Sequence, residues 1–259
     1  MKREQVGTVR ELWRYPVKSL GGEQLTQMLV TPRGALGDRT YAIRELEFGA
    51  IMSARLWSSM LALSASYDAP PDSNGRVRIA LPAGASVFAD EPAAANALSQ
   101  SLNMPVRLER ARPEGFSQEE IVAMVDRGEF VPRRDFFDEE VIHVLASGTL
   151  DHLRTLTGGA ADFDLRRFRP NMYIETASRG FVEDAWYGGE LLIGGEVRIR
   201  GLAPAMRCAM TIHAQCGVPR DPRILETAIR HHGAYVGALA SVASPGLIRL
   251  GDPVVLETG

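Results

Sequence analysis

The sequence predicts a β-rich α+β fold, in which an N-terminal β-barrel-like module precedes a C-terminal β-barrel with a few short helices. Short segments with alternating apolar and polar residues dominate the chain, as expected for half-buried strands. Clusters of glycine, proline, Asp or Asn separate these segments, and helical periodicity is limited to a few stretches. The predicted strands span residues 6–13, 40–45, 76–81, 105–109, 141–145, 172–175, 190–200 and 246–256.

Four stretches have the composition or periodicity of helices: residues 91–102, 117–125, 149–156 and 224–229. The second begins with Ser117 and has Glu120 three residues later, which is the spacing of a capping box. Between two predicted strands, the Asn74-Gly75 pair indicates a tight turn.

A boundary between two modules is predicted between residues 104 and 137, where the chain becomes charged and contains prolines. We therefore expect an N-terminal domain over residues 1–110 and a C-terminal domain over residues 111–259. No repeat of fixed period is present in the sequence.

Composition and charge exclude several classes of protein. The 259 residues are 45% hydrophobic and 24% charged, which excludes collagen-like, disordered and coiled-coil chains. The net charge of −3 comes from scattered residues, so we expect no nucleic-acid partner. The sequence has no signal-peptide core, no apolar run long enough to span a bilayer and only two cysteines, so we expect a cytoplasmic protein without a membrane segment and with reduced thiols.

Two clusters in the first forty residues have the chemistry of an anion site. Lys18 and Ser19 follow a predicted strand and precede two glycines, so an ammonium, a hydroxyl and backbone amides could cradle a phosphate. An ordinary solvated turn is the alternative. Arg39 stands just before a strand, where it could reach a ligand or form a surface ion pair with Asp38; the residues alone do not decide between these.

Two further clusters lie in the second half of the chain. Residues 166–171 contain three arginines and Asn171 just ahead of an apolar strand, which gives either a concentrated positive site or a solvated loop face. Arg207 immediately precedes Cys208, and thiolates are favoured beside arginine. Such a cysteine suits soft metals or nucleophilic work, although a free cysteine is also a small buried hydrophobe.

Several other chemistries are excluded. The sequence has no Gly-x-Gly-x-x-Gly, no Walker lysine motif, no Cys-x-x-Cys pair and no His-Glu-x-x-His. Cys208 and Cys216 do not have a zinc or iron–sulfur spacing. The adjacent His231 and His232 point in different directions on a predicted helix, so we expect both at the surface. Arginine greatly outnumbers lysine in the sequence. One explanation is a GC-rich genome, and the other is that some of the arginines bind phosphate.

Six short motifs occur in a fixed order: Tyr-Pro-Val-Lys-Ser (15–19), Gly-Asp-Arg (37–39), Arg-Phe-Arg-Pro-Asn (167–171), Trp186 followed by Leu-Leu-Ile-Gly (191–194), Arg-Cys (207–208) and Gly-Asp-Pro-Val (251–254). Together they resemble the MOSC family over nearly the whole chain, with an N-terminal MOSC-associated β-barrel domain and then the MOSC domain. The resemblance implies a molybdenum cofactor of the molybdopterin type, held between the two modules.

Matching the motif positions assigns roles to individual residues. The resemblance implies that Cys208 donates its sulfur to molybdenum. It also implies that Lys18, Ser19 and Arg39 contact the pterin and its phosphate. The remaining implied cofactor contacts come from the second module and are Thr149, Arg169, Asn171 and Arg207. Thr149 is the weaker candidate among them.

The implied activity is the reduction of small N-hydroxylated compounds, as in amidoxime-reducing relatives. The chain departs from those relatives after Cys208, where only Thr211 of a Thr-Thr-Val-Asp-Pro stretch is kept. It also lacks the four-cysteine ferredoxin segment that some bacterial relatives carry and the pyridoxal-phosphate sulfurase domain of the cofactor sulfurases. We therefore expect electrons or sulfur to come from a separate electron-donor protein or a cysteine desulfurase. The alternative function is a sulfur or molybdenum-cofactor carrier in which Cys208 serves as a persulfide or as a metal-binding thiol. In the persulfide version, Cys216 acts as a resolving thiol.

Overall fold

The computed structural model describes residues 2–112, 117–127, 136 and 141–259. Its chain forms two compact units. The barrel unit comprises Met1–Arg14, Gln24–Leu36 and Glu139–Gly259, and the small-sheet unit comprises Tyr15–Glu23 and Gly37–Asp138.

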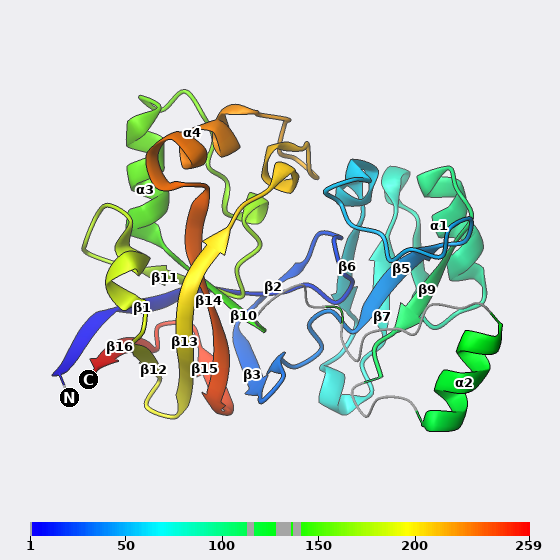
Figure 1. Ribbon diagram of the computed structural model, residues 1–259, viewed down its shortest axis with the longest axis horizontal. Helices are drawn as coiled ribbons and strands as arrows, with labels where there is room; N and C mark the ends of the chain where they lie inside the picture. Colours follow the sequence, from blue (N-terminus) through cyan, green and yellow to red (C-terminus); the bar gives the residue numbers. More distant parts are fainter. Residues whose placement is uncertain (1, 113–116, 128–135, 137–140) are drawn as a thin grey trace. The chain divides into compact units, whose positions relative to one another are not determined.

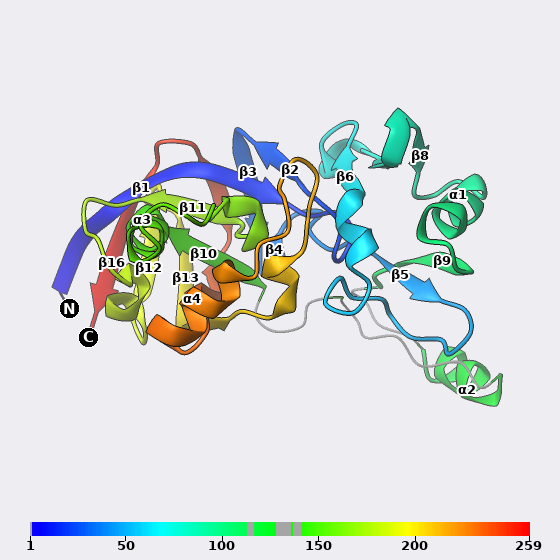
Figure 2. The same ribbon diagram turned by 90° about the horizontal axis from the view of Figure 1, so that it is seen from above.

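The barrel unit contains a closed barrel of seven strands (Figure 1). These strands are β1 (Lys2–Arg14), β10 (Ile142–Ala146), β11 (Met172–Glu175), β12 (Glu190–Ile193), β13 (Val197–Met206), β14 (Tyr235–Ser244) and β16 (Pro253–Thr258). Their order is β11-β10-β14-β13-β12-β16-β1, and pairing of β1 with β11 closes the ring; β2 (Glu23–Leu25) follows β1 in the same sheet. Because β1 also pairs with β16, with Lys2 opposite Thr258, the two termini lie side by side (Figures 1 and 2).

Alternation along the strands places one set of side chains in the barrel core. In β12, for example, Leu191 and Ile193 are fully buried while Leu192 between them is only partly buried. A second sheet, β15-β3-β4, is formed by Gly246–Arg249, Gln27–Thr31 and Gly34–Ala35. The helices α3 (Ser147–Leu156) and α4 (Arg223–His232) lie against the barrel over a second apolar cluster that includes Phe163 and Phe168 (Figure 1).

The small-sheet unit has two small antiparallel sheets and two helices. One sheet pairs β5 (Tyr41–Glu45) with β9 (Val106–Arg110), and the other joins β6 (Ser64–Tyr67), β7 (Val77–Ala80) and β8 (Ser86–Phe88). The helices are α1 (Ala93–Leu102) and α2 (Gln118–Asp126). The short 3-10 helices within the described residues are η1 (Ser58–Ala62), η2 (Pro71–Ser73), η3 (Pro82–Gly84), η4 (Leu165–Arg167), η5 (Val182–Trp186) and η6 (Ala209–Ile212).

The predicted β-rich α+β fold is confirmed, and so is the capping box at the start of α2. The Ser117 amide donates to the Glu120 carboxylate (2.9 Å) and the Glu120 amide donates to the Ser117 hydroxyl (3.1 Å). The predicted turn at Asn74 lies between β6 and β7, with Asn74 in the left-handed conformation. The compact units do not follow the expected linear division at residue 110, because β1 and residues 24–36 belong to the barrel unit.

Three predictions about strands were wrong in detail. Residues 190–200 form a hairpin rather than one strand, because Gly194 and Gly195 turn the chain with positive φ. Residues 246–256 likewise divide between β15 and β16. The second strand of this hairpin, β13, continues beyond the predicted end at residue 200 to Met206, and register shifts accommodate Gly201 and Pro204.

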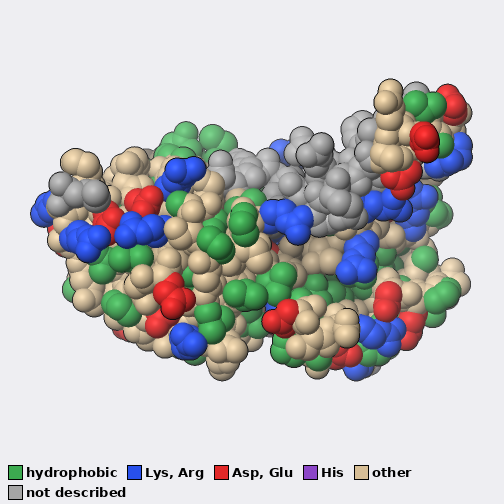
Figure 3. Space-filling model, turned by 90° about the horizontal axis from the view of Figure 1, so that it is seen from below, with side chains coloured by type: hydrophobic (Ala, Val, Ile, Leu, Met, Phe, Trp, Pro, Cys, Tyr) green, Lys and Arg blue, Asp and Glu red, His purple; other side chains and the backbone are tan. Residues whose placement is uncertain are grey.

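The surface carries charges of both signs. On the face in Figure 3, Lys/Arg and Asp/Glu side chains are interspersed over the described surface rather than gathered by sign. Within the described ranges, no helix has the length and hydropathy needed to cross a membrane.

Candidate functional site

Two predicted motifs, Tyr-Pro-Val-Lys-Ser and Gly-Asp-Arg, lie side by side in the small-sheet unit. The Arg39 amide donates to the Tyr15 carbonyl (2.8 Å), and the Tyr41 amide donates to the Pro16 carbonyl (3.0 Å). The Lys18 amide in turn donates to the Tyr41 carbonyl (2.8 Å). Backbone hydrogen bonds therefore bring together two motifs that are separated by residues 20–36 in the sequence.

Lys18 and Ser19 lie in a turn that is fixed from both sides. After the turn, the Gly21 amide donates to the Leu63 carbonyl (2.9 Å). Lys18 is only 8% exposed, and its ammonium donates to the Phe136 carbonyl (3.1 Å). Ser19 has a left-handed backbone (φ 67°), and its hydroxyl has no hydrogen-bond partner within the described part of the chain. A cation and an available hydroxyl on a fixed backbone are the groups that an anion site requires.

Arg39 forms the ion pair with Asp38 that was the alternative to ligand binding, but this pair is not a surface pair. The Asp38 side chain is fully buried and the Arg39 side chain is 18% exposed. Asp38 also accepts from the Tyr15 amide (2.6 Å), and the Arg39 guanidinium lies 5.5 Å from the centre of the Tyr15 ring. Asp38 and Tyr15 therefore fix the direction of the Arg39 side chain, and a guanidinium has enough donors to bind an anion as well.

In the barrel unit, Asn171 joins β1, β10 and the segment that leads into β11. Its side-chain oxygen accepts from the His143 amide (3.1 Å), and its side-chain nitrogen donates to the Trp13 carbonyl (3.4 Å). Its backbone is hydrogen-bonded to the same two residues. Asn171 thus holds the segment that carries Arg169, which is 5% exposed and has a left-handed backbone (φ 56°).

The strand β13 leads directly into Arg207 and Cys208. The Arg207 guanidinium donates to the Ala205 carbonyl (3.0 Å), the Phe168 carbonyl (3.0 Å) and the His143 imidazole (3.1 Å). Because guanidinium nitrogens only donate, His143 Nε2 accepts. Arg207 therefore ties the Arg-Cys motif to the Arg-Phe-Arg-Pro-Asn motif. Cys208 is a free cysteine, half-buried, with extended backbone at the start of η6.

The three arginines ahead of β11 have different environments. Arg166 forms an ion pair with Asp164 (2.7 Å), whereas Arg167 is fully buried and donates only to backbone carbonyls. The predicted concentrated positive site is therefore not formed by all three side chains, because Arg167 faces the protein interior.

Thr149, predicted as a cofactor contact, is fully buried at the start of α3. Its hydroxyl is hydrogen-bonded to the Glu183 carboxyl and accepts from the Val182 amide (3.1 Å). Glu183 also accepts from the Ala146 amide (2.7 Å), and burial raises its pKa. Thr149 therefore helps to hold η5 against α3, and its contact with a cofactor stays a prediction.

Left-handed backbone marks the predicted site in both units. Six non-glycine residues among those described have positive φ, and three of them are Ser19, Arg39 and Arg169. Of the other three, Asn74 and Asn103 cap helices and Ala234 follows the capping Gly233. Arg169 likewise follows the C-cap Phe168 of η4, so Ser19 and Arg39 are the two that lie away from helix ends. A left-handed non-glycine residue costs about 1–2 kcal/mol, and such strain is concentrated at functional sites.

Sequence reasoning missed several of the residues that support the site, and one surface prediction was wrong. His143 and Glu183 are buried polar residues without a local motif, and only their tertiary contacts reveal them. Asp38 was expected as a partner of Arg39, but its burial was not. His231 is exposed as predicted. His232 is half-buried: it stacks on Phe181 and its Nε2 lies 2.9 Å from the Asp184 carboxylate, because the end of α4 packs against η5.

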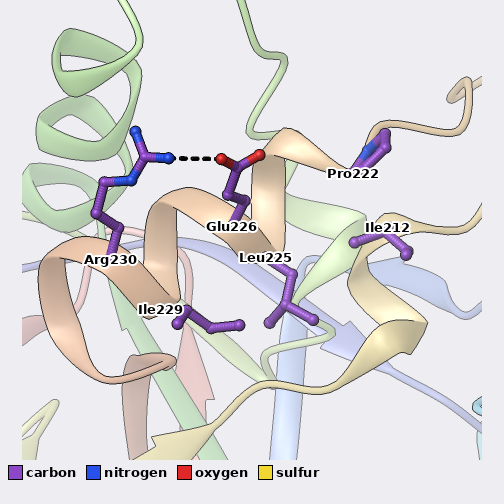
Figure 4. Close-up of a pocket in the computed structure, with 6 residues that line it drawn as sticks. All are labelled: Ile212, Pro222, Leu225, Glu226, Ile229 and Arg230. Carbon is purple, nitrogen blue, oxygen red and sulfur yellow. Dashed lines mark hydrogen bonds and ion pairs between the residues drawn. The ribbon is translucent and has the colours of Figure 1, made fainter.

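A separate apolar pocket of about 320 Å³ lies between η6 and α4 (Figure 4). Ile212, Leu225 and Ile229 line it, and Glu226 forms an ion pair with Arg230 at its side (2.6 Å). None of the predicted site residues lines this pocket. Across the described ranges, no group of three or more His, Cys, Asp or Glu side chains is placed to hold a metal ion.

Comparison with known proteins identifies the family. The MOSC N-terminal beta barrel domain matches residues 6–124, and the MOSC domain matches residues 132–255. The chain belongs to the MOSC family.

Its relatives include two curated proteins. The chain is 26% identical to mitochondrial amidoxime reducing component 2 of Bos taurus, over 97% of this chain and 83% of that protein. It is also 26% identical to mitochondrial amidoxime-reducing component 1 of Mus musculus, over 98% and 83%. Among solved structures, the YUAD protein of Bacillus subtilis is similar with a TM-score of 0.51, 12% identity and coverage of 100% of this chain and 98% of that one, which is a likeness of fold.

Proposed function

We propose that this protein is an oxidoreductase that binds a molybdenum cofactor of the molybdopterin type and reduces small N-hydroxylated compounds. Electrons come from a separate donor protein. Lys18, Ser19 and Arg39 bind the phosphate and pterin, Arg169 adds a third cationic contact, and Cys208 donates its sulfur to the metal.

The observation that carries the proposal is the left-handed backbone of Ser19, Arg39 and Arg169. Ser19 and Arg39 do not lie at the end of a helix, whereas Arg169 follows the C-cap Phe168 of η4. Left-handed backbone at a non-glycine residue is retained where a side chain must be presented in one direction. All three side chains carry a cation or a hydroxyl, which are the groups that bind phosphate.

The donor set also fits a metal that arrives with its own ligands. A bare ion would need several protein ligands, and the described residues offer no such group. A metal already held by a dithiolene needs one more soft donor, and Cys208 is a free, half-buried thiol at a fixed position in the chain. When bound, the molybdenum supplies two-electron redox chemistry. In the overall reaction the N–O bond breaks, two electrons and two protons are consumed, and the oxygen leaves as water.

The test is the molybdenum content of wild type and Cys208→Ser, expressed with ample cofactor supply and measured by elemental mass spectrometry. We expect near-stoichiometric molybdenum in wild type, with loss of the metal or an altered electronic spectrum in Cys208→Ser. The substitution is nearly isosteric, so the fold should be unchanged. Absence of molybdenum from the wild-type protein would refute the proposal.

A second candidate function is a sulfur or cofactor carrier, and the positions of the two cysteines favour it. Both thiols are free, and Cys216 is exposed in the segment that follows Cys208. In this function a cysteine desulfurase transfers a sulfur to Cys208 as a persulfide, and Cys216 attacks it to release the sulfur as hydrosulfide and form a disulfide. Mass spectrometry after incubation with a desulfurase and cysteine tests this: an unmodified Cys208 argues against the carrier.

A further inference from the structure

Arg167 is a fully buried arginine whose side chain is occupied by backbone carbonyls. Its Nε donates to the Asp162 carbonyl (3.1 Å). Its two terminal nitrogens donate to carbonyls of Thr211 (3.1 Å), His213 (3.4 Å) and Pro219 (2.6 Å). Three of these four acceptors lie in the segment just after Cys208, so one side chain fixes that segment at its start, middle and end.

The buried guanidinium of Arg167 and the conformation of residues 209–219 stabilise each other. A buried guanidinium is costly unless its donors are satisfied, and loop carbonyls are equally costly if they are buried without donors. Burial lowers the pKa of Arg167, and the nearby carboxylates Asp162, Asp221 and Asp164 offset part of this effect. With its donors used and its side chain at 0% exposure, Arg167 is not the arginine that binds an anion.

The Arg167 contacts reach Cys208 through one residue. Thr211 is buried, and both its amide (3.1 Å) and its hydroxyl (3.0 Å) donate to the Cys208 carbonyl. On the other side of the cysteine, the Arg207 amide donates to the Ala234 carbonyl (2.8 Å). Cys208 therefore lies between two anchored residues: Arg207 is held by Ala234, just ahead of β14, and Thr211 is held by Arg167.

Arg166 adds a contact at the far end of the segment. Its guanidinium is paired with Asp164 and donates to the Cys216 carbonyl (3.0 Å). Nearby, the Gln215 and Val218 amides and carbonyls exchange hydrogen bonds (2.8 and 2.9 Å). The segment is thus fixed by contacts from the residues just before Arg169 and by a small turn of its own.

We propose that Arg167 is a positioning residue for Cys208, which fixes residues 208–219 so that the thiol is held in one place before any cofactor binds. The inference rests on the proposed function, or on its carrier alternative, only in taking Cys208 as the working thiol. Its geometry is a property of the protein without a cofactor. Arg167 fixes the conformation of residues 208–219, while Arg169 and residues of the small-sheet unit bind the anion.

The experiment measures the reactivity of the Cys208 thiol in cofactor-free protein. In a Cys216→Ser background, Cys208 is the only thiol, so the rate of its reaction with a maleimide reports its environment alone. We expect Arg167→Met to change this rate by about tenfold, equivalent to about 1.4 kcal/mol, and Arg167→Lys to restore part of the wild-type value. Limited proteolysis should cut within residues 209–219 in Arg167→Met and not in wild type.

Arg44→Met is the matched control. Arg44 is also buried (4% exposed) and also donates to a loop carbonyl, that of Gly49, but it lies in the small-sheet unit. It should lower the melting temperature without changing the Cys208 rate by more than about twofold. If folded Arg167→Met keeps the wild-type rate and protease resistance, Arg167 is merely structural and the proposal is overturned. If Arg167→Met does not fold, the same two readouts on Arg167→Lys decide.

The two proposals fail in different ways. If wild type contains no molybdenum but Arg167→Met alters the Cys208 rate, the positioning role stands and the reductase proposal fails. If wild type contains molybdenum and Arg167→Met leaves the Cys208 rate unchanged, the reductase proposal stands and the positioning role fails.

Discussion

Ser19 allows the cost of a left-handed backbone to be separated from the function of its side chain. The residue has φ 67°, and the hydrogen bonds of Lys18 and Gly21 on either side prevent the turn from relaxing. A left-handed non-glycine residue costs about 1–2 kcal/mol, whereas glycine adopts this conformation freely. Glycine also loses about 0.5–1 kcal/mol more conformational entropy on folding. The Ser19 hydroxyl makes no protein hydrogen bond in the described ranges, so its removal adds no further loss.

Ser19→Gly should therefore stabilise the cofactor-free protein by about 0.5–1 kcal/mol, the difference between these two effects. For a protein of this size the melting temperature should rise by about 1–4 °C in calorimetry. Ser19→Ala keeps the strained backbone and removes only the hydroxyl, so it should be no more stable than wild type. A Ser19→Gly variant that melts at or below the wild-type temperature would show that the backbone is not strained.

The same pair of variants tests the role of the hydroxyl. If Ser19 binds the phosphate, both variants should retain the cofactor about tenfold less tightly, because a hydrogen bond to a charged group contributes about 1.5 kcal/mol. Retention is measured as the molybdenum that remains bound after gel filtration at a series of dilutions. Ser19→Gly would then raise the stability of the cofactor-free protein and at the same time weaken its binding of the cofactor. Equal retention by wild type and both variants would remove Ser19 from the site.

Three further predictions follow from the contacts. Arg39→Lys keeps a charge opposite the buried Asp38 but loses the guanidinium fork, so retention should weaken by about 1–2 kcal/mol in the same gel-filtration assay; unchanged retention would contradict the phosphate contact. Cys208→Ala should abolish reductase turnover and persulfide formation at an unchanged melting temperature, whereas Cys216→Ala should affect only the carrier function. Burial raises the pKa of Glu183, so the folded protein binds a proton at this carboxyl more tightly than the unfolded chain does. The stabilisation from the protonated Glu183 is therefore complete below the usual carboxyl pKa. It is lost, at about 1.4 kcal/mol per pH unit, as the pH rises from the usual carboxyl pKa to the folded-state pKa. Glu183→Gln should remove this slope in pH-dependent denaturant titrations, and identical slopes would show that Glu183 does not titrate in this way.

Elements with a local signal could be predicted from the sequence, and those defined by distant pairing could not. The helix α2 has a capping box within four residues, and β11 is a short run of apolar residues with distinct ends. The strand β14 is built largely of alanine, glycine and serine, so it lacks the usual strand pattern. Its small residues suit closely packed neighbours: a Cβ at Gly237 would lie 2.4 Å from His143 Nε2. Likewise, no local pattern of β1 indicates that it pairs with β11 and β16.

The same limit applies to the site. By composition and spacing alone, Arg166, Arg167 and Arg169 are equivalent candidates for binding an anion, and only the motif resemblance singles out Arg169. In the structure one is paired with Asp164, one is enclosed by carbonyls of a segment more than forty residues later, and one has a left-handed backbone ahead of Pro170. Which of three neighbouring arginines faces inward depends on where residues 211–219 fold, and that depends on α4 and β14.

A consequence is that an alanine scan of this cluster would mislead if only activity were measured. Arg167→Ala and Arg169→Ala should both abolish turnover, the first by releasing the segment that holds Cys208 and the second by removing a cofactor contact. Reactivity of the Cys208 thiol in the cofactor-free protein separates them, because only the Arg167 substitution should change it. If Arg169→Ala changed that reactivity as strongly, the two arginines would share one structural role and the assignment of Arg169 to the cofactor would lose its support.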